Sequence, residues 1–188
     1  MQHAKKISKR TRVVTGTTLA AAIALGGFGA YSASAADAEP AAQAAAKPAA
    51  AKAGNTFESK HLTVGAATDA AEAVLKAAKK ENQKVSVAVV DRNGNTIVEL
   101  RGDGAGPQSP ESAVKKAYTA VSWNAPTSEL TKRLEQTPNL RDIPGTLFLA
   151  GGAPVVSDGG PIAGIGVAGA PSGDQDEKFA QAGVAALG

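Results

Sequence analysis

Few residues in this sequence of 188 could act as catalytic groups or metal ligands, and most of those that could are carboxylates. There is no Cys, which excludes disulfides, thiolate metal sites and cysteine catalysis. Beyond the first 35 residues, the only imidazole belongs to His61, just ahead of a predicted helix. Carboxylates stand at Glu111 and in the group Asp174, Asp176 and Glu177, each time where a helix is predicted to start. As surface groups, His61, Glu111, Asp176 and Glu177 are candidate ligands for iron, a hard metal that accepts oxygen ligands.

Each of these candidates also has an interpretation that involves no chemistry. His61 can simply be an exposed histidine that precedes a helix. Glu111 lies four residues before Lys115, a spacing at which opposite charges stabilise a helix. The acidic group at 174–177 likewise suits the positive end of a helix dipole. The residue types alone therefore leave an iron site and a set of helix-stabilising charges as alternatives.

Motifs typical of enzymes find little support. A Ser-His-Asp triad would have to use His61, yet no Gly-X-Ser-X-Gly nucleophile motif occurs. Residues 164–169 spell Gly-X-Gly-X-X-Gly, but Ala170-Pro171-Ser172-Gly173 separates them from the next predicted helix. A dinucleotide site needs that helix to follow at once, because its amino terminus receives the pyrophosphate. We expect these glycines to let a strand pass close under a helix or a neighbouring subunit.

The charge is distributed unevenly along the chain. The formal net charge is +3, but five basic residues and no acidic ones lie among residues 1–35. Residues 36–188 therefore hold 15 basic and 17 acidic residues, a formal charge of −2. The basic character belongs to one end of the chain, so we expect no nucleic-acid partner.

The amino-terminal segment has the order of a secretory signal. Basic residues at 5–12 precede an uncharged, apolar stretch at 13–31, and Ala33-Ser34-Ala35 follows. We expect cleavage after Ala35, export by the Sec or the Tat route, and a secreted, cell-wall-associated protein; a membrane anchor is the alternative. Residues 36–54 are rich in Ala and contain no Leu, Ile, Val or aromatic residue, which predicts a disordered spacer. The folded domain is then 55–188.

Periodicity and turn residues predict a mixed α and β domain. Apolar residues recur at helical spacing through 62–81, and Asn93-Gly94 between two β-rich runs predicts a hairpin. We expect helices at 62–81, 109–123, from Thr127 onward and at 174–187, and strands at 85–90, 95–101, 146–150, 154–156 and 162–168. Short connections favour an antiparallel five-stranded sheet flanked by about four helices.

Several segments together resemble the GlcG/HbpS family. They are Val87-Ala88-Val89-Val90-Asp91-Arg92-Asn93-Gly94, Lys115-Lys116-Ala117-Tyr118-Thr119-Ala120, Ile143-Pro144-Gly145, Gly151-Gly152-Ala153-Pro154-Val155, and Ile165-Gly166-Val167-Ala168-Gly169-Ala170 with Asp176-Glu177. The match spans 60–188, and the signal and spacer are similar to those of the secreted branch of the family. The resemblance implies a profilin-like α/β fold, a homo-octamer, and extracellular binding of haem b and iron ions. It also implies partnership with the ectodomain of a membrane sensor histidine kinase in the response to redox or haem stress.

The resemblance also implies roles for individual residues. In the secreted branch a Thr at the position of Thr146 is implicated in haem coordination; the alternative is a Thr that closes the Pro-Gly turn. A neutral hydroxyl is a weak iron ligand, so the porphyrin would have to be buried against apolar residues such as Phe148. Relatives carry a Glu-X-X-Glu iron site, of which Glu111 matches the first member while Val114 replaces the second. Tyr118 could coordinate ferric iron, although its spacing favours a place in the core.

The function expected is that of an extracellular haem- and iron-binding protein that assists a membrane sensor kinase. One alternative is an enzyme that degrades haem or acts on a small organic acid, although no paired acid and base or cofactor motif supports it. The other alternative is an accessory that docks on a kinase without physiological haem binding.

Overall fold

The structure is a computed structural model that describes residues 48–188. The predicted signal at 1–35 and most of the predicted spacer at 36–54 lie outside the described residues. Within them, residues 48–63 contain only a short 3-10 helix, Ala53–Asn55. None of the helices in the described part of the chain is long and apolar enough to span a membrane.

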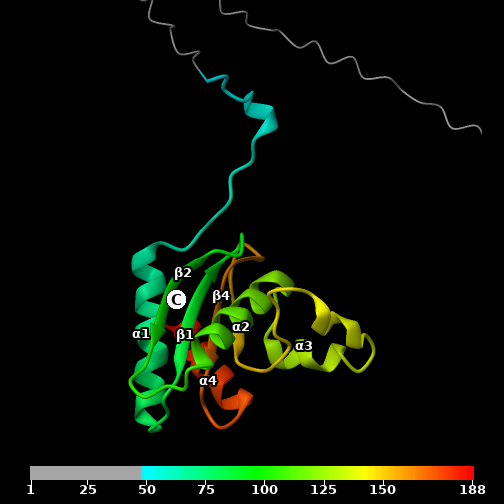
Figure 1. The fold of residues 1–188 in the computed structure, drawn as a ribbon. Coiled ribbons are helices and arrows are strands. Elements are labelled where there is room, and N and C mark those ends of the chain that lie inside the picture. The colour runs from blue at the N-terminus through cyan, green and yellow to red at the C-terminus, as the bar shows by residue number, and fades with distance from the viewer. Residues whose placement is uncertain (1–47) are drawn as a thin grey trace, which may run out of the picture. The chain divides into compact units, whose positions relative to one another are not determined.

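Four helices and four strands make up the folded part (Figure 1). In chain order they are α1 (Val64–Lys80), β1 (Ser86–Asp91), β2 (Thr96–Arg101), α2 (Ser109–Trp123), α3 (Thr127–Arg133), β3 (Gly152–Ser157), β4 (Gly160–Ala168) and α4 (Gly173–Ala185), with a 3-10 helix at Pro138–Asp142. The mixed α and β class and the four predicted helices are confirmed. The Thr63 side chain accepts a hydrogen bond from the Ala66 amide and caps α1.

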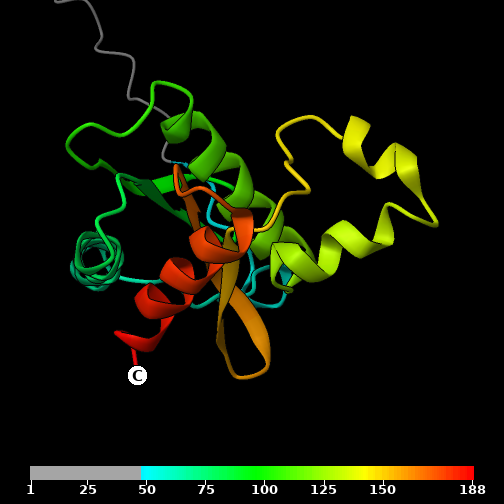
Figure 2. The same ribbon diagram turned by 90° about the horizontal axis from the view of Figure 1, so that it is seen from below.

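The strands form one antiparallel sheet in the order β2-β1-β4-β3. The sheet is covered on both faces, because successive side chains of a strand point to opposite sides. Val87 and Val89 of β1 pack in the cluster that includes α1 and α4, whereas Ala88 and Val90 pack toward α2. Figure 2 accordingly shows α1 and α4 on one side of the sheet and α2 on the other.

The prediction of a fifth strand at 146–150 is wrong, because this segment is a loop. Its backbone polar groups bond to side chains or within the local turn and not to a neighbouring strand. The Leu147 amide donates to the Thr119 hydroxyl at 2.8 Å, and the Phe148 carbonyl accepts from the Thr131 hydroxyl at 3.2 Å. Apolar composition suggested a strand here, but α2 and α3 hold the segment instead.

The Gly-X-Gly-X-X-Gly run is a close contact between β4 and α2. A Cβ atom added to Gly166 would lie less than 3.0 Å from the backbone of Ala113 and Ala117, and one added to Gly164 would meet the Ala117 carbonyl as closely. The helix therefore rests directly on the strand at the two glycines. The expectation that a strand passes close under a helix is confirmed.

Candidate functional site

Thr146 lies in a tight turn between α3 and β3. Its hydroxyl donates a hydrogen bond to the Ile143 carbonyl at 2.8 Å, and its amide points to the same oxygen at 3.3 Å. Gly145 has a φ of +80°, which favours glycine and allows the chain to reverse. Thr146 thus closes the Pro-Gly turn, as one of the two interpretations predicted. Because its proton is engaged in this bond, its lone pairs remain available to a ligand.

The ring of Tyr118 lies between this turn and the β1–β2 hairpin. A Cβ atom added to Gly94 would approach one edge of the ring at 2.8 Å, and one added to Gly145 would approach the other edge at 3.7 Å. The ring also packs on Val90, Ala117 and Val121. It is half-buried, so the predicted core role and a place beside the Thr146 turn are combined in one residue. Sequence alone did not indicate that the two turns meet at this ring.

The apolar residues around Thr146 divide into an outer and an inner set. Ile143 is 40% exposed and Leu149 is 54% exposed, so both present apolar surface to solvent. Phe148 is only 4% exposed, and its ring meets that of Trp123 edge to face at a centroid distance of 5.1 Å. Phe148 therefore supports the loop from beneath, and its direct contact with a porphyrin would require this cluster to open.

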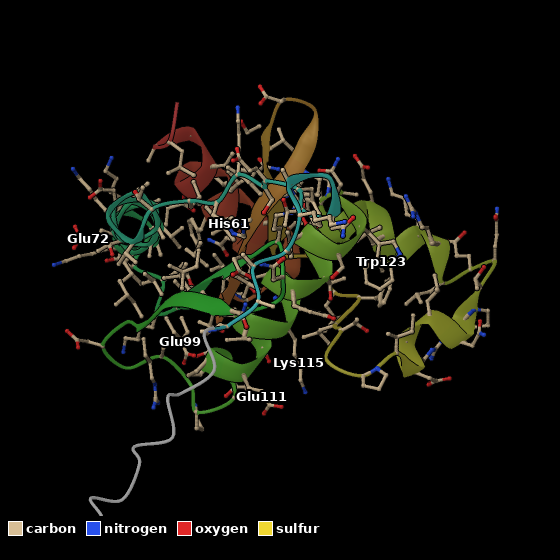
Figure 3. All side chains as sticks on the ribbon, turned by 90° about the horizontal axis from the view of Figure 1, so that it is seen from above. His61, Glu72, Glu99, Glu111, Lys115 and Trp123 are labelled. Atoms are coloured by element: carbon tan, nitrogen blue, oxygen red, sulfur yellow. The ribbon has the colours of Figure 1, made fainter. Side chains whose placement is uncertain are left out.

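Glu111 and His61 are exposed and lie on different elements. Glu111 is in the first turn of α2 and pairs with Lys115 at 2.6 Å; the hydrogen bond from Lys115 lowers the pKa of its carboxyl. Val114, at the place of the second Glu of the related iron motif, packs against Val90 and Ala117. His61 precedes α1 and bonds through Nε2 to the Ser59 hydroxyl at 2.8 Å. Figure 3 shows Glu111 beside Lys115 and His61 well apart from them.

Asp176 is buried, so the expectation that it is a surface carboxylate is wrong. Its side chain is 5% exposed and pairs with Lys116, itself 6% exposed, at 2.9 Å. Lys116 Nζ also donates to the Val167 carbonyl at 3.0 Å, and the other Asp176 oxygen accepts from the Ala170 amide at 2.9 Å. Burial raises the pKa of the Asp176 carboxyl, against the opposing effect of Lys116.

Glu177 is also buried, at 6% exposure, and is not on the surface as expected. It accepts hydrogen bonds from the Ser128 amide at 2.9 Å, the Gly151 amide at 3.2 Å and the Thr127 hydroxyl at 3.2 Å. These donors belong to the start of α3 and to the residue before β3. Asp176 and Glu177 thus tie α4 to α2, to α3 and to the residue before β3, which their position at a helix end did not reveal.

The predicted iron ligands are not brought together. His61, Glu111, Asp176 and Glu177 share no hydrogen bond, and the last two have their oxygens occupied by protein donors. Over residues 48–188, no three His, Asp or Glu side chains gather in a way that would hold a metal ion. The four residues do not form a single pre-built iron site in the described chain.

The chain is similar to known proteins in both sequence and structure. The family model with the description "Haem degrading protein HbpS-like" matches residues 62–185. A crystal structure of Streptomyces reticuli HbpS with two Glu-to-Asp substitutions is 69% identical, with a TM-score of 0.76; the match covers 77% of this chain and 99% of that one. The PduOC:heme complex is 29% identical, with a TM-score of 0.62, and the match covers 68% and 95%. An uncharacterized 15.0 kDa protein of Citrobacter freundii, from the dhaT-dhaS intergenic region, is 33% identical over 125 residues, which is 64% of this chain and 87% of that protein.

Proposed function

The chain belongs to the HbpS-like family, and on that premise we propose that it is an extracellular haem-binding protein whose iron ligand is Thr146. Family membership confirms the resemblance that the motifs indicated. The observation that carries the proposal is the match to the family over 62–185, together with a related structure that is a haem complex. Haem b is the form of haem proposed.

The surroundings of Thr146 support its role. The Thr146 proton is donated to Ile143, which leaves the oxygen lone pairs directed away from that bond. Exposed Ile143 and Leu149, three residues before and after Thr146 in the chain, provide apolar surface for a porphyrin. Because a hydroxyl binds iron weakly, burial of the macrocycle has to supply most of the binding free energy. A pocket completed by a neighbouring subunit would serve this purpose.

Titration of the protein with hemin is expected to shift the Soret band. Thr146→Ala removes the proposed ligand and should change that spectrum more than His61→Ala does, because His61 lies on another element and bonds to Ser59. The measurement is the absorption spectrum and the affinity of each variant. Glu72→Gln, which changes an exposed carboxylate of α1, serves as a surface control and should leave the spectrum unchanged.

Two results would contradict this assignment. A spectrum equal to the sum of free hemin and protein would remove haem binding altogether. Loss of the Soret shift in His61→Ala alone would transfer the ligand role from Thr146 to His61. Asp176 and Glu177 are buried with their oxygens bonded to protein donors, so the exposed His61 and Glu111 are the ligands proposed for iron ions in the absence of haem. His61→Ala and Glu111→Gln are each expected to bind ferrous iron more weakly than the unmodified protein in a titration without haem.

We also propose secretion, assembly into a homo-octamer and contact with the ectodomain of a membrane sensor histidine kinase. These proposals follow from the amino-terminal signal and from the family resemblance. Sedimentation at micromolar concentration should give eight copies, and the kinase ectodomain should co-purify with the protein in a hemin-dependent manner. Recovery of monomer alone would remove the octamer, and equal capture with and without hemin would favour a docking role independent of haem.

Oxidative degradation of haem is the second candidate function, because the matching family is described as haem degrading. The hemin titration distinguishes it from simple binding. Consumption of more than one equivalent of hemin per protein, with a defined tetrapyrrole product, would establish turnover. A stable stoichiometric complex would favour binding.

A further inference from the structure

A pocket of about 500 Å³ lies between the carboxyl-terminal end of α1, the α1–β1 connection and the end of β2. It is on the α1 face of the sheet, whereas the Tyr118 ring beside Thr146 packs with residues of the α2 face. Its volume is within the range of small-molecule sites, which is about 300 to 1,000 Å³. Because the pocket and the Thr146 turn are on opposite faces of the sheet, the pocket is separate from the proposed haem site.

The floor of the pocket is apolar. It is formed by the half-buried Leu75 of α1, with buried Ala78 of α1 and Val85, just before β1, beneath it. Gly102 closes one wall by lying against the strand: its amide donates to the Val85 carbonyl at 2.9 Å. A Cβ atom there would lie 2.7 Å from the same carbonyl, so only glycine lets the wall approach so closely. An apolar body is the kind of ligand that this floor would cover.

The rim of the pocket is cationic. Lys79, Lys84 and Arg101 line it together with one carboxylate, Asp103. None of the three cations forms an ion pair within residues 48–188. Three positive charges against one negative charge leave a local excess that favours an anion.

Arg101 is held in place by the loop that follows β2, and the exposed Lys84 lies against the same loop. The Arg101 guanidinium donates to the Ala105 carbonyl through Nε at 3.1 Å and Nη2 at 2.6 Å. The stem of Lys84 passes over Gly104, where an added Cβ atom would lie 3.0 Å from Lys84 Cδ. The antiparallel register pairs Ser86 with Arg101, which is why cations far apart in sequence meet at one rim. Positive groups that are already positioned lose less entropy when they bind.

We propose that this pocket binds a small organic acid with an apolar body, its carboxylate at the Lys79, Lys84 and Arg101 rim and its apolar part on the Leu75, Ala78 and Val85 floor. This site does not depend on the haem-binding proposal. An uncharged ligand of the same shape would contact the apolar floor but would not be attracted by the cationic rim. A negative charge is therefore the property that distinguishes the proposed class of ligand.

Calorimetry on the full chain with octanoate and with its uncharged analogue octanamide tests the proposal. Octanoate is expected to bind more tightly than octanamide. The double variant Lys79→Gln/Lys84→Gln should weaken octanoate binding by about tenfold and leave octanamide binding unchanged, because each exposed charge contact contributes about threefold to the affinity. The matched control is Lys76→Gln/Lys80→Gln, which removes two exposed α1 charges outside the pocket lining and should have little effect.

A variant that is expected to strengthen octanoate binding distinguishes an effect of the rim charges from a loss of the folded pocket. Asp103→Asn removes the one carboxylate of the rim and should tighten octanoate binding about twofold to threefold, which an unfolded pocket could not do. Thr146→Ala should leave octanoate binding unchanged, so failure of haem binding and failure of this proposal are distinguishable. Equal affinity for octanoate and octanamide, or equal weakening by the two Lys double variants, would overturn the proposal.

Discussion

Replacement of Gly166 by Ala is expected to destabilise the protein by about 3 kcal/mol or more, at the upper end of what overpacking costs. The new methyl group would meet the backbone of Ala113 and Ala117 of α2 at less than 3.0 Å. Backbone cannot move away as the end of a flexible side chain can. Helix α2 would have to lift from β4, and the clusters that it buries against Ala88 and Val90 would open.

Urea denaturation measures the effect as a lower midpoint at an unchanged slope. Gly160→Ala is the matched control in the same strand, because the nearest atom to its added Cβ atom is the Ser157 carbonyl oxygen at 4.0 Å. We expect this control to lie within about 0.5 kcal/mol of the unmodified protein. Equal midpoints for the two variants would show that the contact between β4 and α2 is not the reason for glycine at position 166.

The glycine run illustrates what local pattern can and cannot predict. The interruption at 170–173 was enough to exclude a dinucleotide site and to predict a close approach of backbone. The helix bounds to within two residues and the Asn93-Gly94 hairpin likewise follow from short-range rules, and the hairpin joins β1 to β2. The segment at 146–150 was misassigned because its partners are the Thr119 and Thr131 side chains, to which no local pattern points.

The candidate site was less predictable than the fold, for a physical reason. Asp176 and Glu177 at the start of α4 have the pattern of solvated charges, and only the packed structure places Lys116 and the α3 amino terminus against them. The family resemblance identifies Thr146 as a candidate haem ligand, and the Pro-Gly sequence before it predicts the turn. In the pocket beside α1, Lys84 and Arg101 meet through the β1–β2 register, so sequence separation concealed them.

Loss of either member of the Lys116–Asp176 pair is the second change expected to have a large effect. Asp176→Asn would leave a buried ammonium whose remaining partner is the Val167 carbonyl, and Lys116→Met would leave a buried carboxylate with the Ala170 amide. Breaking a buried pair by removing one partner costs about 3 to 5 kcal/mol, because an uncompensated charge stays in the interior. Each single variant should therefore show a much lower denaturation midpoint.

The double variant Lys116→Met/Asp176→Asn completes a thermodynamic cycle. Asn keeps an oxygen for the Ala170 amide and Met keeps most of the volume of Lys, so the double variant should cost about 2 kcal/mol less than the sum of the single variants. Strict additivity would contradict a direct interaction between the two side chains.

The dependence of stability on pH provides an independent check on the same pair. Burial raises the pKa of the Asp176 carboxyl in the folded protein. Between its ordinary value and the raised value, the folded state binds more protons than the unfolded state, so the stability contributed by this group falls as the pH rises through that window. Without Lys116 the pKa should rise further. The deficit of Lys116→Met should therefore be largest at neutral pH and shrink as the pH is lowered toward the ordinary range of an Asp, and a deficit that stays constant with pH would place the cause in lost packing instead of charge.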